Sequence, residues 1–146
     1  MLLTNESDYS LRIIRALADG EKQTVKAISE TELIPFNFAY KILKKMEKAG
    51  ITQSIHGPGG GYRLVKPLDS LSLYDVISAV EEDVLVFQCL RSDRQCQRDP
   101  GGNMCTVHME FARIQELLVN EMKAKTMKEI LESKNLIKEG CPEDMR

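Results

Sequence analysis

The feature that most constrains the fold of this chain is a glycine-rich run, His56-Gly57-Pro58-Gly59-Gly60-Gly61, between two short stretches of alternating residues. Residues 51–55 alternate like a strand, and residues 62–65 are a suitable partner. Glycine adopts the positive φ angles that a tight turn needs, so the run is typical of a hairpin tip. No helix begins within reach of these glycines, which disfavours the phosphate-binding loop of an enzyme. The segment therefore predicts a β-hairpin.

Three helical segments precede the hairpin. Residues 6–19 carry apolar side chains at helical spacing. A second, short helix is expected over residues 24–31, with Thr24 as its N-cap. A third is expected over residues 35–49, because Pro35 suits the first helical position. Three helices followed by a glycine-tipped hairpin make a winged helix-turn-helix, so the predicted fold class is mainly α with a small β-hairpin wing.

The third helix has two chemically distinct faces. One is formed by Ala39, Ile42, Leu43 and Met46, and the other carries Asn37, Tyr40, Lys41, Lys44 and Lys48. Lysines suit phosphate contacts, and polar side chains suit base edges in the major groove, although many lysine-rich faces only meet solvent. We favour DNA binding, with contacts predicted at Pro35, Asn37, Phe38, Tyr40, Lys41, Lys44, His56, Gly59, Gly60 and Arg63.

Charge and composition narrow the function classes. Residues 1–66 have a net charge of +3 and residues 67–146 a net charge of −5, which suits a nucleic-acid-binding first half. The chain has two histidines, no tryptophan and no visible catalytic acid–base constellation, so we expect no enzyme. No apolar run approaches the roughly 18 residues of a membrane helix, and no signal peptide is visible. We therefore expect a cytoplasmic protein without membrane contact.

The second half carries further helical signals. A capping box, Ser72-x-x-Asp75, opens one helix, and Thr126-x-x-Glu129 opens a short final one. Between them a long helix starts at Thr106, with an apolar stripe of Val107, Phe111, Ile114, Leu118 and Met122. An exposed apolar stripe is costly in a monomer, so we expect this helix to form an interface. The predicted divisions are a DNA-binding head (1–66), a connecting helix with a cysteine-bearing loop (67–105), a dimerisation helix with a short final helix (106–133) and a mobile tail (134–146).

Three of the four cysteines lie close together in a polar stretch with few apolar residues. Cys89, Cys96 and Cys105 are followed by His108. Thiolates are soft ligands that suit iron–sulfur clusters or zinc, and a metal centre would organise a segment that has little core of its own. The paired C-x2-C of zinc fingers is absent, which disfavours a simple zinc site. The alternative is three free thiols on a loop. Cys141 is interpreted as a bystander thiol, with redox partnership as the alternative.

The order of several motifs matches a known family. These are Leu3-Thr4, Asp8-Tyr9-Ser10-Leu11-Arg12, Tyr40-Lys41-Ile42-Leu43-Lys44-Lys45-Met46, Ala49-Gly50-Ile51, Gly57-Pro58-Gly59-Gly60-Gly61-Tyr62-Arg63-Leu64 and Val76-Ile77-Ser78-Ala79-Val80-Glu81. Together they resemble the Rrf2-type winged-helix transcription regulators, the family with IscR-like, NsrR-like and CymR-like members. The glycine wing with its tyrosine is the most specific motif, and the resemblance spans about residues 1–132.

The resemblance implies a homodimer in which the long helix packs on its mate, with double-stranded operator DNA as the partner. It also implies that Cys89, Cys96 and Cys105 hold an iron–sulfur cluster, of 2Fe-2S or 4Fe-4S type, whose state sets DNA affinity. IscR-like members use a histidine three residues beyond the last cysteine, which His108 matches. NsrR-like members use an aspartate in the first helix of the other subunit, which Asp8 matches. We favour His108 and keep Asp8 as the alternative.

The sequence therefore predicts a dimeric DNA-binding repressor that senses redox state, nitric oxide or iron supply through a cluster. The alternative is a cluster-free regulator of the same fold that acts through a partner protein or a small ligand, as CymR-like members do.

Overall fold

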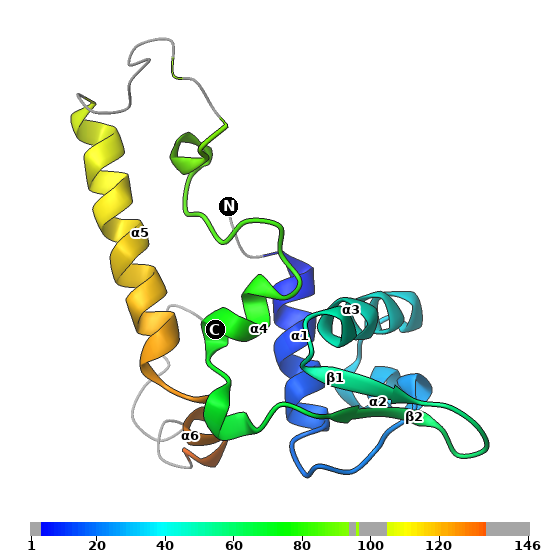
Figure 1. The fold of residues 1–146 in the computed structure, drawn as a ribbon. Coiled ribbons are helices and arrows are strands. Elements are labelled where there is room, and N and C mark those ends of the chain that lie inside the picture. Colours follow the sequence, from blue (N-terminus) through cyan, green and yellow to red (C-terminus); the bar gives the residue numbers. More distant parts are fainter. Residues whose placement is uncertain (1–3, 94–95, 97–104, 134–146) are drawn as a thin grey trace.

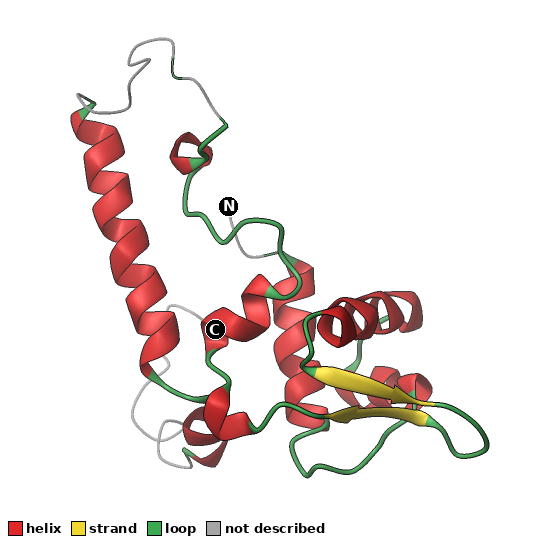
Figure 2. Ribbon diagram, in the orientation of Figure 1, coloured by secondary structure: helices red, strands yellow, loops and turns green. Residues whose placement is uncertain are grey.

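The computed structural model describes residues 4–93, 96 and 105–133. Within them the chain is mainly helical with one two-stranded antiparallel sheet, so the predicted fold class is confirmed (Figures 1 and 2). The elements in chain order are α1 (Asn5–Ala16), α2 (Val25–Glu32), α3 (Phe36–Lys48), β1 (Thr52–Ile55), β2 (Gly61–Leu64), η1 (Leu68–Ser70), α4 (Leu73–Ser78), η2 (Gln88–Leu90), α5 (Thr106–Ala124) and α6 (Met127–Glu132).

The core lies among α1, α2, α3 and α4. Ile13 and Ile14 of α1 and Ile28 of α2 have no exposed surface, and the four apolar residues predicted for one face of the third helix are equally buried. Each such side chain stabilises the fold by about 1.5–3 kcal/mol through burial. Val76 and Val80 close the core from the α4 side. The head is therefore a packed unit built from consecutive elements.

The ends of the first three helices differ from the predicted ones by one to three residues. The first helix ends at Ala16 instead of Asp19, because Leu17 leaves helical geometry and the Gly20 N–H bonds back to its carbonyl at 3.1 Å. Pro35 is the N-cap of α3 and not its first residue, because its ψ of 132° is extended. Thr24 caps α2 as predicted, its side chain accepting from the Ala27 N–H. Both predicted capping boxes are present.

The hairpin explains why its glycines are needed. Gly59 has a φ of 70°, which side-chain-bearing residues rarely adopt. A Cβ on Gly60 would lie 2.3 Å from the Ile55 carbonyl oxygen, and one on Gly61 would lie 2.4 Å from the Gln23 carbonyl oxygen. Gln23 and Tyr62 exchange two backbone hydrogen bonds, at 2.9 and 2.8 Å. Close packing inside the head therefore requires residues 60 and 61 to be glycine.

Helix α5 extends away from the head along one side of the molecule, opposite the hairpin (Figure 1). Met122 is its one buried residue. Near that end the Lys123 ammonium lies 4.3 Å from the centre of the Tyr74 ring of α4. Among the described residues, none of the helices combines the length and apolarity needed to cross a membrane.

Candidate functional site

The exposed face of α3 carries the residues predicted to contact DNA. Asn37, Tyr40, Lys41, Lys44 and Lys48 are all exposed, while Ala39, Ile42, Leu43 and Met46 have no exposed surface. Lysines near the last turn also match the negative end of the helix dipole. The helix therefore presents a cationic and polar face on a rigid support. Pro35 is exposed just before it, and Phe38 packs edge-on against Tyr9 with ring centres 6.0 Å apart.

Lys44 occupies the junction between α3 and the wing. Its ammonium lies 5.9 Å from the centre of the Tyr40 ring and 5.8 Å from that of Tyr62 in β2. It donates to Glu47 at 2.9 Å, and this hydrogen bond is the main reason why the pKa of Lys44 is raised. Lys44 is held between two aromatic rings and a carboxylate, which keeps its charge at the edge of the exposed face.

Glu47 ties α3 to the wing, a role that sequence reasoning missed. Its Oε1 accepts from the Ser54 N–H at 2.8 Å and from the Ser54 Oγ at 2.5 Å, while Oε2 accepts from Lys44. The Ser54 hydroxyl is the largest cause, ahead of Lys44, that lowers the pKa of Glu47 to about 2. The one sequence feature that could have indicated this role is a carboxylate among the lysines of the helix. Helical spacing does not predict its contact with Ser54, because Ser54 belongs to β1.

Glu6 of α1 holds two lysines of α3. It accepts from Lys41 at 2.7 Å and pairs with Lys45 as well, and these two hydrogen bonds, Lys41 first, lower the pKa of Glu6. Lys45 also donates to the Val80 carbonyl at 2.6 Å. Lys41 therefore forms an ion pair in the free chain. To contact a phosphate or a base, its ammonium must first leave Glu6.

The wing presents its predicted residues at the surface. His56, Gly59 and Arg63 are exposed, and Gly60 is half-buried. The Arg63 guanidinium donates to the Gln53 side chain at 3.3 Å across the strand pair. Lys22, which the sequence analysis did not single out, is exposed near the tip, since a Cβ on Gly59 would lie 3.8 Å from its Nζ. Sequence periodicity does not predict that Lys22, which lies between α1 and α2, is close to the wing, because this contact joins distant parts of the chain.

The cysteine-bearing segment is anchored to α5. The Gln115 side chain accepts from the Val86 N–H at 2.6 Å and donates to the Val84 carbonyl at 2.7 Å. Phe87 stacks on Phe111 with ring centres 3.7 Å apart. These contacts hold η2 beside α5.

Three predicted cluster ligands therefore lie on neighbouring elements. Half-buried Cys89 is in η2, half-buried Cys105 is the N-cap of α5, and His108 lies in its first turn. Cys96 is exposed, and none of the three cysteines is in a disulfide. Within the described ranges, no three His, Cys, Asp or Glu side chains are grouped closely enough to hold a metal ion. Cys141 and the predicted mobile tail fall outside the described residues.

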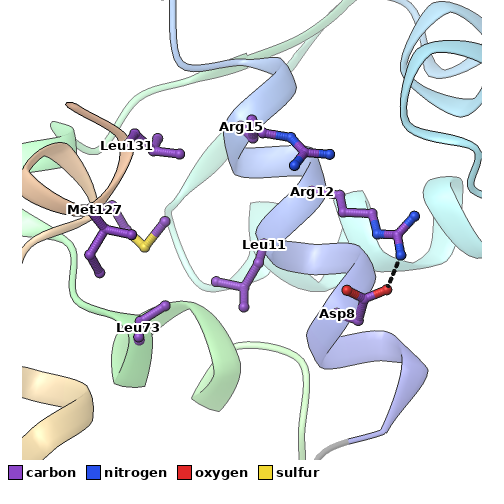
Figure 3. A pocket seen from close by; sticks show the side chains of 8 residues that line it. Asp8, Leu11, Arg12, Arg15, Leu73, Met127 and Leu131 are labelled. Carbon is purple, nitrogen blue, oxygen red and sulfur yellow. Dashed lines mark ion pairs between the residues drawn. The ribbon is translucent and has the colours of Figure 1, made fainter. Parts of the chain in front are cut away.

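Asp8 lies on α1, in an ion pair with Arg12 at 2.8 Å (Figure 3). The two residues border a pocket of about 480 Å³ between α1, α4 and α6, with apolar side chains from all three helices. Asp8 is not grouped with Cys89 and Cys105 of its own chain. The structure therefore separates the two candidate fourth ligands, with His108 beside Cys105 and Asp8 on the head.

Known proteins share both the sequence pattern and the fold. A family model described as Rrf2, iron-dependent transcriptional regulator, matches residues 3–133. The HTH-type transcriptional regulator IscR of Vibrio campbellii is 33% identical over 141 residues, which are 90% of this chain and 82% of the relative. The HTH-type transcriptional regulator NsrR of Bacillus subtilis is 32% identical over 110 residues, which are 73% of this chain and 70% of the relative.

Solved structures support the same architecture. CymR, the global cysteine regulator of Bacillus subtilis, superposes with a TM-score of 0.68 at 19% identity, covering 90% of this chain and 96% of that one. IscR of T. potens superposes with a TM-score of 0.68 at 14% identity, covering 100% and 97%. At these identities the likeness shows the fold alone, and it confirms the predicted winged-helix architecture.

Proposed function

The chain belongs to the Rrf2 family of transcriptional regulators, a family of DNA-binding proteins and not of enzymes, and from this premise we propose that it is a homodimeric repressor whose DNA affinity is set by an iron–sulfur cluster. The division of labour follows the predicted boundaries. Residues 1–66 read DNA, residues 67–105 carry the cysteines, and residues 106–133 join the two subunits.

The exposed face of α3 is the observation that supports DNA reading. Asn37, Tyr40 and Lys41 are exposed, and the opposite side of their helix is packed into the core. In helix-turn-helix proteins such a helix enters the major groove, with phosphate contacts fixing its register. Lys44 lies beside Tyr62 of β2 and Lys22 lies near Gly59 at the tip, so two cations adjoin the wing where DNA backbone would pass.

The uncovered surface of α5 supports a dimer. Leu117 is 52% exposed and Val107 is 58% exposed, although both are large apolar residues, and at 100° per residue they lie within one broad face of the helix. The predicted stripe is used in part within the chain, since Phe111 stacks on Phe87. A second copy of α5 would bury the remaining apolar residues, which otherwise stay in contact with water at a cost of about 25 cal/mol per Å².

The cysteines fit an iron–sulfur cluster in their donor chemistry. Thiolates are the usual ligands of such clusters, and Cys89, Cys96 and Cys105 are outside disulfides. When bound, the cluster supplies a centre that reacts with oxidants or nitric oxide and depends on iron supply. The chain's own part is to hold Cys89 beside α5 through Gln115 and to place Cys105 at the start of that helix.

The fourth ligand distinguishes two arrangements. His108 lies one turn beyond Cys105, so it would complete the site within one subunit. Asp8 is apart from the cysteines of its own chain, so it would serve from the other subunit and would join the site directly to α1. We favour His108. The His108→Ala and Asp8→Ala variants separate the two arrangements, because the true ligand alters the visible spectrum of the bound cluster.

A set of hydrogen bonds connects the cysteine segment to the head. Glu81 accepts from the Thr4 hydroxyl at 2.6 Å and from the Ser7 hydroxyl at 2.5 Å, and the preceding Val80 carbonyl accepts from Lys45 of α3. The chain that continues to Cys89 therefore starts at residues that contact both α1 and α3. Ordering of the cysteine segment would shift the spacing of two heads in a dimer, and half-site spacing sets affinity for an operator.

Anaerobic purification tests the proposal. We expect visible absorption with bound iron and sulfide, and different affinities of cluster-bound and cluster-free protein for DNA from the chain's own upstream region. Protein that takes up no cluster on anaerobic reconstitution, yet binds this DNA, would instead support the cluster-free alternative. The fold shared with CymR, the global cysteine regulator of Bacillus subtilis, supports that alternative.

A further inference from the structure

The turn between α2 and α3 carries two exposed apolar side chains outside the predicted DNA contacts. Leu33 is 81% exposed and Phe36 is 52% exposed. We propose that this pair, called here the apolar tip, contacts thymine methyl groups in the major groove and so contributes to operator choice. The inference rests on the proposed function of α3 as the reading helix, and it names side chains that read one particular base.

Leu33 is held in a conformation that suits glycine. It is the C-cap of α2 with a φ of 54° and a ψ of 46°, and among the described residues no other non-glycine has a positive φ. Glycine is the usual residue at such a helix end, because a Cβ is strained there. Because the Leu33 side chain is 81% exposed, burial does not compensate for this backbone strain. This side chain therefore contributes little to the fold of the free protein.

Two apolar neighbours of the apolar tip have partners inside the protein. Ile34 is 2% exposed and belongs to the core, and Phe38 packs against the Tyr9 ring. Phe38 is 45% exposed, close to the 52% of Phe36, but it has the Tyr9 ring as a partner, and Leu33 is the most exposed of these apolar side chains at 81%. Large exposed apolar residues scattered singly are ordinary, but two of them three residues apart on the helix-turn-helix form a local apolar surface.

The neighbours of Phe36 indicate the chemistry of its partner. Tyr40 follows Phe36 by one turn of α3, and Lys44 follows Tyr40 by another, with its ammonium over the Tyr40 ring. The apolar tip thus stands at the start of a row that ends in a cation. DNA offers a partner for each end of this row. The thymine methyl group in the major groove suits the apolar tip, and the nearby phosphate backbone suits the Lys44 ammonium. Double-stranded DNA is therefore the occupant to which we commit.

The test replaces thymine by uracil, which removes the methyl group and leaves base pairing intact. A binding duplex is first selected from a random pool with the wild-type full chain. Replacement at the contacted thymine should weaken binding about fourfold, the factor that corresponds to one methyl-sized group buried. The Phe36→Ala and Leu33→Gly variants should bind the thymine and uracil duplexes equally. Val65→Ala, which truncates an exposed apolar residue directly after β2 at the base of the wing, should keep the difference.

Stability measurements separate reading from folding. Leu33→Gly should keep or raise the melting temperature, because glycine adopts this φ without strain. Loss of thymine discrimination in a variant of unchanged stability cannot come from unfolding.

Three results would overturn the inference in distinguishable ways. If the wild type selects a duplex but tolerates uracil at every position, the apolar tip does not read thymine, and the DNA-binding proposal stands. If no duplex is selected at all, both proposals fall. If either variant changes the oligomeric mass in light scattering without DNA, the apolar tip is a contact between protein chains.

Discussion

The winged-helix head and helix α5 differ in where their apolar faces find partners. In the head, Ile42 and Met46 of α3 have no exposed surface, because α1, α2 and β1 of the same chain cover them. In α5, nineteen residues long, Met122 is the one buried residue, and Leu117 stays half exposed. Both helices are amphipathic. The same periodic pattern thus builds a closed core in one region and leaves an open surface in the other.

Their polar contacts differ in the same way. The head joins its elements through charged side chains, with Glu6 linking α1 to α3 and Glu47 linking α3 to β1. Helix α5 is attached in part through uncharged groups, among them Gln115 with the backbone of Val84 and Val86. The elements of the head are therefore joined to one another by ion pairs as well as by a buried core.

The largest expected effect comes from removing one cysteine. Cys105→Ala should abolish stable cluster binding, because three thiolates are the principal ligands. The head should keep its fold, since its core contains none of these residues. Iron and sulfide analysis with visible absorption measures the first effect, and circular dichroism with thermal melting measures the second.

Cys141→Ala is the matched control and should leave iron content unchanged. A triple variant at Cys89, Cys96 and Cys105 that still purifies with iron and sulfide would contradict the assignment.

A charge on the open surface of α5 should have the next largest effect. Leu117→Glu places a carboxylate where a second subunit is expected, and an unpaired buried charge costs about 3 kcal/mol or more, a factor above one hundred in the dissociation constant. Leu117 suits this test better than half-buried Ile114 of the predicted stripe, because it faces solvent in the single chain. Light scattering should report monomers.

Lys26→Glu, which changes an exposed lysine on α2, serves as the control and should keep the dimer mass. The same mass for Leu117→Glu would mean that this part of α5 is not the interface.

Sequence periodicity predicted the head well because its decisive contacts repeat at short spacing. Ala39, Ile42, Leu43 and Met46 follow the helical period, and all four are buried. The capping boxes at Ser72 and Thr126 are likewise contacts over three residues, and both form. Short-range patterns thus predicted which segments are helical and which face is buried. The observed helix ends differ from the predicted ones by a few residues, because the backbone angles at Leu17 and Pro35 end or precede the helix there.

Contacts between distant residues could not be predicted in this way. Glu6 and Lys41 are 35 residues apart, and Glu47 meets Ser54 only because β1 folds back along α3. Leu33 was missed because its left-handed backbone is normally a sign of glycine. The cysteines pose a further limit, because residues 94–95 and 97–104, which separate them along the chain, lie outside the described ranges.

Lysine removal on α3 should have a smaller, graded effect. Lys41→Ala or Lys44→Ala should weaken binding to all DNA sequences and reduce the slope of log affinity against log salt by about one for each lost phosphate contact. The expected loss of affinity is small because each lysine already has a carboxylate partner. A phosphate must displace Glu6 from Lys41 or Glu47 from Lys44, and breaking that ion pair offsets part of the binding free energy of the new contact. Affinity is measured over a salt series with a fixed duplex.

Lys26→Ala on α2 is the control for general charge and should leave the slope nearly unchanged. If the Lys41 and Lys44 variants keep both affinity and slope, α3 is not the reading helix. Changes at Asn37 or Tyr40 should instead reduce preference between sequences.

The smallest expected effect concerns the pH dependence of the junction between α3 and the wing. The pKa of Glu47 is lowered from an ordinary value of 4.5 to about 2, chiefly by the Ser54 hydroxyl. A carboxyl group with a lowered folded pKa contributes stability that is complete above about 4.5 and is lost as the pH falls toward about 2. Glu47→Gln should therefore flatten the melting temperature profile between these values and change little near neutrality. Ser54→Ala should shift the acid loss upward in pH, because it removes the main cause of the lowered pKa. Coincident wild-type and Glu47→Gln profiles from pH 2 to 4.5 would show that this carboxylate does not hold the wing against the helix.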